Sequence, residues 1–357
     1  MLEGRTSRIL ARASLLIGGL LAGFLVVEIV LRLATPWLSP PLRALITDEA
    51  YQAGQSAIRV MHGSTSVLRV EDFRRRQDIV VVGDSMAFGW MVKEDEVFTT
   101  LLARHTGQSV LNLGITGAGP CVYNRMIQMA LARLPAPPST VIYTLFANDI
   151  TDADCDLSDW AFQWDTASTS WRSQIREFRE RLFLHSVVYQ IVKRVVATRH
   201  LSSELREYAP VHFRDSRMEL LFAPASSWRP ALDLGLPEVR SGLEQTLSTI
   251  QAARLMTERR GSRFILVLMP CKEQVYLPWL TEQGLLPREV YPPFYDEIYD
   301  QIKRRTELSG TATLDLRPAL RAEARKGLKL YWTLDGHQTA AGHAVTAQAL
   351  EYSLRGR

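Results

Sequence analysis

Five short apolar runs rich in β-branched residues constrain the fold of this 357-residue chain more than any other feature. They are too continuous to leave one face of a strand in water, and a stretch with helical spacing follows each. This alternation predicts an α/β fold of three layers, α/β/α: a five-stranded parallel sheet, doubly wound and flavodoxin-like, in the order 2-1-3-4-5. The predicted strands are 79–82, 110–113, 141–146, 264–269 and 312–316, and the predicted helices are 97–105, 123–134, 243–259, 294–305 and 344–354.

The N-terminus carries an uncharged apolar run, 13–27, preceded by three arginines. That charge bias predicts a cytoplasmic N-terminus and a translocated body. The apolar stretch 9–33 is long for a signal-peptide core and no clear small-x-small cleavage site follows it, which favours an uncleaved transmembrane signal anchor over a cleaved signal peptide. Glu28 and Arg32 stand four residues apart and are expected to pair near the lipid headgroups.

The pattern divides the chain into three parts. Residues 1–34 are a cytoplasmic stub and transmembrane anchor, 35–75 a juxtamembrane linker, and 76–357 the α/β domain. An insertion at about 152–240 interrupts that domain after the third strand. Its middle, 175–199, predicts a long amphipathic helix whose basic face either rests on anionic lipid or is solvated.

Composition excludes several classes of protein. The formal charge is +4, and half of this excess comes from residues 1–35, so a nucleic-acid partner is not expected. Three cysteines exclude a disulfide-rich scaffold, and Cys121 and Cys155 either pair in an oxidising compartment or simply pack. The sequence holds no CxxC, HExxH or GxxxxGK[ST] motif, so we expect no metal and no cofactor.

The first predicted strand runs directly into Gly83, Asp84 and Ser85. Gly83 permits a tight exit from the strand, and a following helix N-terminus would stabilise negative charge near the Ser85 hydroxyl. Asp and Ser are also ordinary N-cap residues, so this segment alone does not identify a site.

Residues in other segments supply the remaining groups of a catalytic site. Gly117 follows the second predicted strand and Asn148 the third, while Asp335 and His337 stand near the C-terminus. A serine nucleophile, a histidine base, an aspartate that orients it and several N–H donors form an acyl-transfer site. In a sheet of this order the first and third strands meet at the switch point, where ligands bind.

From about 78 to 354 the sequence resembles the SGNH (GDSL) hydrolase superfamily, whose ordered blocks are Gly-Asp-Ser, a Gly, Asn-Asp and a terminal Asp…His. The resemblance implies that Ser85 is the nucleophile, His337 the base and Asp335 its partner. It also implies an oxyanion hole of the Ser85 N–H, the Gly117 N–H and the Asn148 side chain.

The chain departs from the family pattern in two places. Ala147 stands where the family commonly has Gly. The terminal block is Asp-x-His rather than Asp-x-x-His, a spacing found in relatives that acetylate exopolysaccharides. Asp335 is therefore the predicted partner of His337, with Asp315, at the end of the fifth strand, as the alternative.

A segment from Pro270 to Tyr276 resembles a Pro-x-Lys…Tyr segment of polysaccharide O-acetylation proteins. Together with Asp84, its Lys272 and Tyr276 are predicted to contact the substrate. A surface loop is the other interpretation of this segment.

These features predict a bacterial single-pass protein of the cytoplasmic (inner) membrane, with its N-terminus inside and its catalytic domain facing the periplasm or exterior. The predicted activity is that of a serine esterase acting on O-acyl groups, above all O-acetyl groups, of a cell-envelope or secreted glycan. One alternative is an O-acetyltransferase supplied by a separate multi-span membrane partner. Another is a catalytically silent glycan-binding module.

Overall fold

The computed structural model describes residues 2–38, 43, 67–69, 73–151, 163–165, 186–188 and 211–355. The chain divides into two compact units, Met1–Gly54 with Ser170–Glu207, and Gln55–Thr169 with Tyr208–Arg357. Most of the predicted linker and most of the predicted helix 175–199 lie outside the described residues, as does Cys155.

The centre of the larger unit is a five-stranded sheet in which every neighbouring pair is parallel. Its order is β3-β2-β4-β8-β9, which confirms the predicted 2-1-3-4-5 order and the α/β fold class. The strands are β2 (Ile79–Val82), β3 (Val110–Asn112), β4 (Thr140–Leu145), β8 (Arg263–Leu268) and β9 (Ala312–Asp315).

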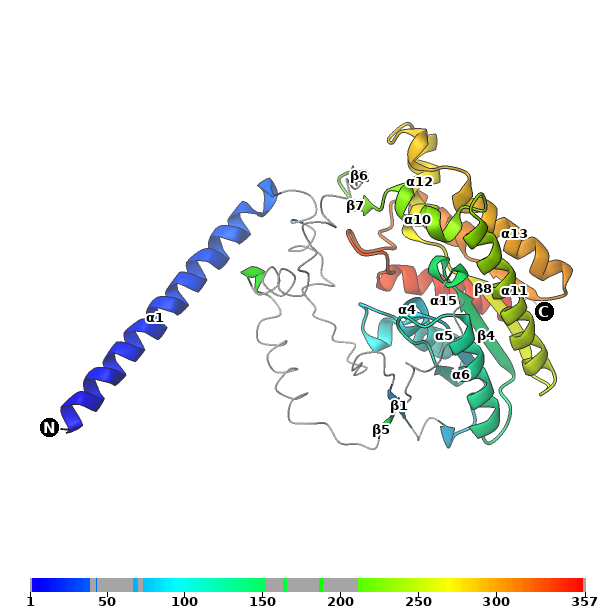
Figure 1. Cartoon of the computed structure of the whole chain (residues 1–357), viewed down its shortest axis with the longest axis horizontal. Helices are drawn as coiled ribbons and strands as arrows, with labels where there is room; N and C mark the ends of the chain where they lie inside the picture. The colour runs from blue at the N-terminus through cyan, green and yellow to red at the C-terminus, as the bar shows by residue number, and fades with distance from the viewer. Residues whose placement is uncertain are drawn as a thin grey trace. The chain divides into compact units, whose positions relative to one another are not determined.

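Side chains of the central strands alternate between two apolar layers, as the period of two in a strand requires. Val80 and Val82 face one layer, whereas Ile79 and Val81 face the other. The first layer is covered by α6 (Pro120–Arg133), α10 (Ala225–Leu232), α11 (Pro237–Glu258) and α13 (Phe294–Leu308). The second is covered by α5 (Phe98–Thr106), α12 (Lys272–Glu282), α14 (Arg317–Arg325) and α15 (Ala340–Arg355). In Figure 1, α6 and α11 lie side by side over one face of the sheet.

Several elements were not predicted from the sequence. The helices α4 (Ser85–Phe88), α10, α12 and α14 are short, interrupted by proline or rich in arginine. An antiparallel hairpin of β6 (Val211–Arg214) and β7 (Glu219–Phe222) falls inside the predicted insertion, yet it packs into the second layer. The remaining elements are the parallel pair β1 (Val67–Arg69) and β5 (Gln163–Asp165), and the 3-10 turns η1 (Thr35–Trp37), η3 (Glu94–Glu96), η4 (Ala147–Ile150) and η5 (Arg288–Val290).

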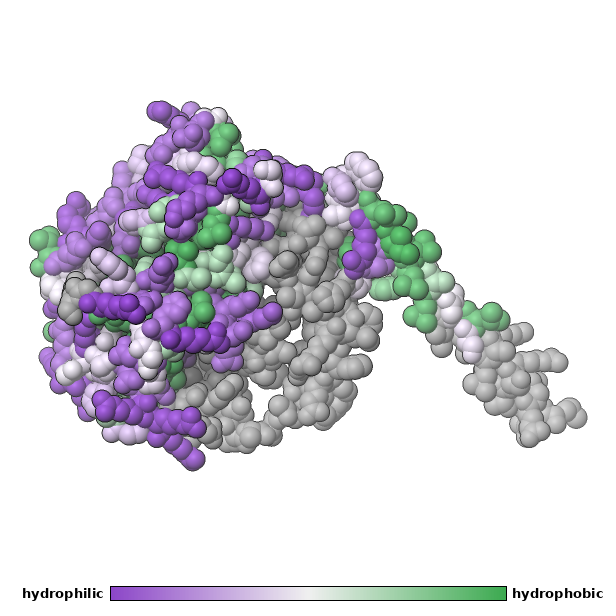
Figure 2. Space-filling model, turned by 180° about the vertical axis from the view of Figure 1, so that it is seen from behind, coloured by the Kyte–Doolittle hydropathy of each residue, from purple (hydrophilic) through white to green (hydrophobic). Residues whose placement is uncertain are grey.

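The smaller unit contains α1 (Leu2–Ala34). The stretch Ser14–Trp37 is long and apolar enough, by length and composition, to cross a membrane, and it forms the green surface of this helix in Figure 2. The predicted pair is present: Arg32 Nε donates to Glu28 Oε1 at 2.8 Å. Glu28 also accepts the backbone N–H groups of Val187 and Val188 at 2.9 and 3.0 Å, so hydrogen bonds compensate its buried carboxylate.

Helix α11 lies unusually close to the turn η4. A Cβ built at Gly242 would lie 2.3 Å from the carbonyl oxygen of Ile150, far inside contact distance. Only a residue without a side chain allows this approach.

We predict that Gly242→Ala destabilises the larger unit, although alanine favours a helix by about 1 kcal/mol over glycine. Forcing extra atoms into packed structure costs about 1–3 kcal/mol, and here the obstacle is a backbone carbonyl that cannot rotate away. Denaturant unfolding followed by circular dichroism measures the difference. The exposed neighbour Ser241 supplies the control, because Ser241→Ala adds helix propensity without a clash. Equal or greater stability of Gly242→Ala would contradict the close approach.

Candidate active site

The site begins where β2 ends. Ser85 is the first residue of α4, and Asp84 caps that helix because its Oδ1 accepts the Met86 N–H at 2.9 Å. A Cβ at Gly83 would lie 1.8 Å from Thr144 Oγ1, so glycine is needed where the chain leaves β2 beside β4. These contacts hold the half-buried Ser85 at the carboxyl edge of the sheet.

Ser85, His337 and Asp335 form a continuous chain of hydrogen-bond contacts. The Oγ of Ser85 lies 2.7 Å from His337 Nε2 and 3.3 Å from Asp84 Oδ2. On the other side of the ring, His337 Nδ1 lies 2.5 Å from Asp335 Oδ1. The same Oδ1 accepts the backbone N–H of His337 at 2.8 Å, so one carboxylate oxygen fixes both the ring and its backbone. The Asp-x-His spacing therefore places the acid correctly.

Burial and neighbouring charges determine the protonation states of His337, Asp335 and Asp84. Partial burial disfavours a charged His337, but its hydrogen bond to Asp335 and the negative charges of Asp335 and Asp84 outweigh this and raise its pKa above the ordinary 6.5. Burial also disfavours the Asp335 carboxylate, yet the bonds from His337 outweigh it and lower the pKa of Asp335 to about 2. For Asp84, burial dominates and raises the pKa. Asp335 thus stays ionised wherever His337 titrates.

The loop after β3 contains two glycines with different roles. The Gly114 N–H donates to Asn112 Oδ1 at 2.9 Å, and a Cβ at Gly114 would lie 2.4 Å from the Phe88 backbone nitrogen. Gly114 therefore serves packing against α4. Gly117 is exposed, has a φ of 75°, and within the described residues its N–H has no hydrogen-bond partner. The N–H of Gly117 is thus available to a ligand, as is that of Ser85, since the first residue of a helix has no intrahelical acceptor.

Asn148 lies in η4, directly after β4. Its Oδ1 is buried without a hydrogen-bond partner among the described residues. The turn is held by Asp149, whose carboxylate accepts from the Phe146 N–H at 2.7 Å and from the Tyr123 hydroxyl at 2.7 Å. Sequence reasoning did not assign these positioning roles to Asp149 and Tyr123, although the adjacent Asn-Asp pair pointed to this turn.

The predicted substrate contacts of Asp84, Lys272 and Tyr276 are wrong, because all three side chains are buried. Asp84 caps α4. The Lys272 ammonium donates to backbone carbonyls of residues 332–335, and the Tyr276 hydroxyl donates to the Leu328 carbonyl at 2.6 Å. The segment around Lys272 is also no surface loop, since it is the start of α12.

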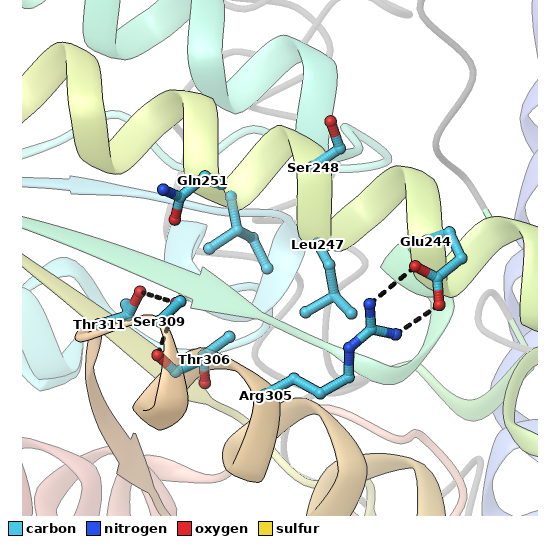
Figure 3. Close-up of a pocket in the computed structure, with 9 residues that line it drawn as sticks. Glu244, Leu247, Ser248, Gln251, Arg305, Thr306, Ser309 and Thr311 are labelled. Carbon is cyan, nitrogen blue, oxygen red and sulfur yellow. Dashed lines mark hydrogen bonds and ion pairs between the residues drawn. The ribbon is translucent and has the colours of Figure 1, made fainter.

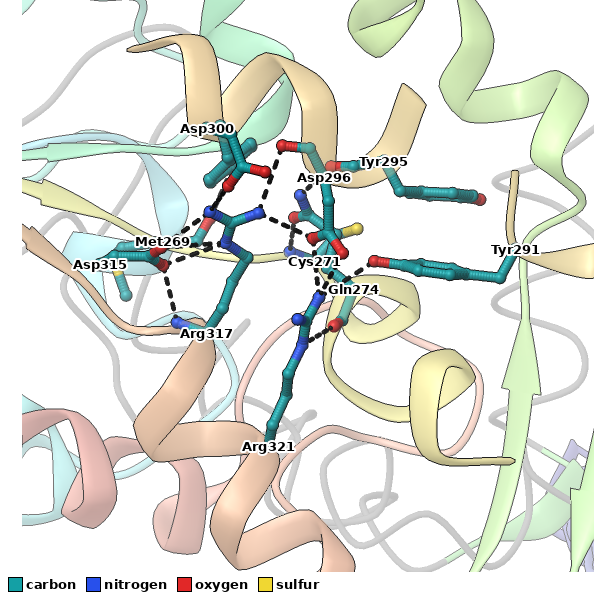
Figure 4. A network of polar contacts seen from close by, with 11 residues as sticks. Met269, Cys271, Gln274, Tyr291, Tyr295, Asp296, Asp300, Asp315, Arg317 and Arg321 are labelled. Carbon is teal, nitrogen blue, oxygen red and sulfur yellow. Dashed lines mark hydrogen bonds and ion pairs between the residues drawn. The ribbon is translucent and has the colours of Figure 1, made fainter. Parts of the chain in front are cut away.

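The alternative partner for His337, Asp315, is wrong as well. Both of its carboxylate oxygens accept from Arg317, which also pairs with Asp296 at 2.7 Å and Asp300 at 2.6 Å. Figure 4 shows this network, to which Arg321 adds a second cation. Asp315 therefore pairs with a buried arginine, so its carboxylate is not available to His337.

Two other features lie apart from the catalytic chain. His343 is buried in α15, stacks on Phe98 and accepts the backbone N–H of Phe98 at 3.3 Å. Burial lowers the pKa of His343 to about 3.

A hollow of about 310 Å³ lies between α11 and α13, and the ion pair of Arg305 and Glu244 crosses it (Figure 3). Among the residues that the structure describes, no three His, Cys, Asp or Glu side chains converge as metal ligands would.

Residues 233–357 match the family model "SGNH hydrolase-like domain, acetyltransferase AlgX". This match covers Asp335 and His337, whereas Ser85, Gly117 and Asn148 precede it. The matched model describes an SGNH hydrolase-like domain, and the contacts among Ser85, His337 and Asp335 are those of a serine esterase or acyltransferase site.

No curated protein matches the sequence. Among solved structures, a lipolytic protein of the G-D-S-L family from Veillonella parvula is similar with a TM-score of 0.40 and 11% identity, covering 78% of this chain and 98% of that one. A catalytic mutant of Axe2, an acetylxylan esterase from Geobacillus stearothermophilus, is similar with a TM-score of 0.39 and 14% identity, covering 80% and 96%.

We predict that the pKa of His337 lies above 6.5 in the natural chain and falls in Asp335→Asn, because the substitution removes the anion that favours the imidazolium. Titration of the histidine ring resonances by NMR measures both values, with His337→Ala for assignment. The His343 resonance, with a pKa of about 3, reports whether the core is intact. An unchanged His337 pKa in Asp335→Asn would show that the two residues do not interact in solution.

Proposed function

We propose that this SGNH-type serine enzyme moves O-acetyl groups of a cell-envelope or secreted glycan through an acyl-Ser85 intermediate, while α1 anchors it in the cytoplasmic membrane. The observation that carries the proposal is the unbroken chain from Ser85 Oγ through the His337 ring to Asp335. A serine beside a histidine base is the common requirement of acyl transfer.

In the first step the Ser85 oxygen attacks the carbonyl carbon of an ester, and His337 Nε2 takes the hydroxyl proton. Asp335 stabilises the imidazolium through Nδ1–H. Collapse of the tetrahedral intermediate breaks the ester bond, and His337 returns the proton to the leaving alcohol. An acyl group is then bound to Ser85 as an ester.

The negative oxygen of the tetrahedral intermediate requires hydrogen-bond donors. The N–H groups of Ser85 and Gly117 and the side-chain amide of Asn148 come from segments that follow β2, β3 and β4, which are neighbours in the sheet. Removal of one such donor typically costs about 2.7–4 kcal/mol of transition-state stabilisation. The Nδ2 group of Asn148 suits this role because it donates to no protein group within the described residues.

The second step divides an esterase from a transferase. His337 activates either water or a sugar hydroxyl, which attacks the acyl carbon and releases Ser85. The match to an acetyltransferase family model favours the sugar as acceptor, so we place O-acetyl transfer ahead of simple hydrolysis. The half-buried Trp90, 6.5 Å from the His337 ring between centroids, offers an aromatic face beside the acyl group for a sugar ring.

The proposed location rests on the N-terminus. Ser14–Trp37 is a candidate membrane span, and the arginines before it favour a cytoplasmic N-terminus. Cys121, at the start of α6, is disulfide-bonded, which fits an oxidising compartment outside the cytoplasm. A silent glycan-binding module is disfavoured, because binding alone would not require the Ser85–His337–Asp335 alignment.

We predict that a fluorophosphonate adds once to the detergent-solubilised chain, and not at all to Ser85→Ala, as read by intact mass. Asp335→Asn should slow the reaction about 10⁴-fold, the scale seen when the triad carboxylate is replaced. The rate should rise with pH through an apparent pKa above 6.5, because His337 must be neutral to take the proton. As a control, Asp315→Asn should keep the natural rate if it folds. Failure of the folded natural chain to react would contradict an activated serine.

We further predict that acetyl release from p-nitrophenyl acetate divides between free acetate and acetylated oligosaccharide when glycan fragments are added. Transfer predicts acetyl-oligosaccharide that rises at the expense of free acetate, because both acceptors attack the same acyl-Ser85. Mass spectrometry of the glycan measures the product, with Ser85→Ala as the blank. Free acetate alone, with every envelope glycan tried, would favour an esterase.

A further inference from the structure

The ammonium group of Lys272 is enclosed by backbone oxygens. The side chain is buried, and Nζ lies 3.2 Å from the carbonyl oxygen of Trp332, 3.0 Å from that of Thr333, 3.3 Å from that of Leu334 and 3.1 Å from that of Asp335. These four carbonyls belong to consecutive residues, and the last belongs to the acid that orients His337.

The segment that surrounds the ammonium is a tight hairpin. Tyr331 and Gln338 form an antiparallel bridge, and the Trp332 N–H donates to the His337 carbonyl at 3.1 Å. Between these positions four carbonyl dipoles point toward one place. Such dipoles repel one another, so a positive charge at their centre stabilises the turn.

Packing alone does not explain a lysine at this position. Burial of an ammonium is costly unless hydrogen bonds compensate it. Lys272 is moreover the first residue of α12, where the helix dipole disfavours a positive charge. The benefit of a lysine here must therefore come from the four backbone carbonyls that its ammonium binds.

The structure assigns to Lys272 the role of a positioning residue, whose ammonium holds the hairpin in the one arrangement in which Asp335 Oδ1 meets both N–H groups of His337. This inference rests on the proposed acyl transfer and deepens it, because it explains how the base comes to face Ser85.

The spacing of Lys272 and Tyr276 supports this role. Residues four apart lie on one face of a helix. One turn beyond Lys272, the Tyr276 hydroxyl accepts the Leu330 N–H at 2.7 Å and donates to the Leu328 carbonyl. One face of α12 therefore binds the hairpin at its base and at its turn, which gives the Pro-x-Lys…Tyr segment a structural meaning.

The next residue ties α12 to a second element. Glu273 Oε1 accepts the Ala223 N–H at 2.9 Å, directly after β7. In β7 itself, the Leu221 N–H donates to the Thr333 carbonyl at 2.9 Å, an oxygen that Lys272 also binds. The hairpin is thus held between the first turn of α12 and β7.

The charge of Lys272 also acts on the base. The titratable groups that influence the pKa of His337 are Asp335 in the hairpin, Asp84 before α4 and Lys272 in α12, while His343 in α15, with a pKa of about 3, is neutral in that range. Of these, Asp335 and Asp84 raise the pKa of His337 and Lys272 lowers it. Loss of the ammonium should therefore raise that pKa.

The test compares Lys272→Met with the natural full-length chain in detergent, by the rate of fluorophosphonate addition and by NMR titration of His337. A displacement of about 1 Å costs about 100-fold in rate, and we expect a loss of that scale. The acid limb of the pH profile should move to higher pH. Lys329→Met is the matched control: that half-exposed ammonium donates to the Thr333 hydroxyl at 2.7 Å, and the rate and pH profile should stay unchanged.

A chemical rescue separates positioning from mere folding. Lys272→Ala removes the atoms from Cγ to Nζ, which propylammonium replaces. We expect propylammonium to restore part of the rate and the lower His337 pKa, whereas propanol, of the same length without the charge, does not. This variant also serves if Lys272→Met does not fold.

A folded Lys272→Met with the natural rate and the natural His337 pKa would overturn the inference. So would a slow Lys272→Ala whose rate and pKa respond equally to propylammonium and propanol, or to neither. The NMR titration decides the matter even if no variant, natural chain included, reacts with the phosphonate. A natural chain that does not react with the phosphonate would contradict the proposed acyl transfer, but not the positioning role of Lys272.

Discussion

The site depends first on the parallel pairing of β2 with β3 and β4. Because both neighbours run parallel to β2, the segments that follow the three strands emerge at one edge of the sheet. These segments carry Ser85, Gly117 and Asn148. The strand β2 is buried along its whole length, and Gly83 leaves no space beside Thr144. Three of the proposed groups are thus positioned by the packing of the sheet itself.

The base reaches this edge in a different way. His337 follows Ser85 by more than 250 residues and stands on a hairpin outside the five-stranded sheet. No strand of that sheet fixes its register, so its position depends on contacts with α12 and β7. A serine held by the core and a base held by side chains respond differently to mutation. Changes in the sheet affect folding, whereas changes beneath the hairpin affect the alignment of an otherwise folded protein.

The sequence predicted the sheet well because buried parallel strands are continuous apolar runs, and 79–82 coincides with β2. The family resemblance implied Gly117 as a donor; within the described residues its N–H has no partner, whereas the N–H of Gly114 donates to Asn112. The sequence could not predict the burial of Lys272, because a lysine in a polar segment usually points to solvent. It named Asp335 as the partner of His337 but left Asp315 as an alternative, because what excludes Asp315 is the position of Arg317 within the fold.

The short spacing of Asp335 and His337 and the buried lysine beneath them belong to one physical solution. With a single residue between acid and base, Oδ1 reaches both the backbone N–H and the ring only if the chain turns sharply. Gly336 does not cause this turn, because its φ is not positive and a Cβ there would meet open space. The turn instead directs four successive carbonyls toward one point, where a cation stabilises them. Lys272 supplies that cation from a helix that the core already holds, so the geometry of the base is tied to the packing of the domain.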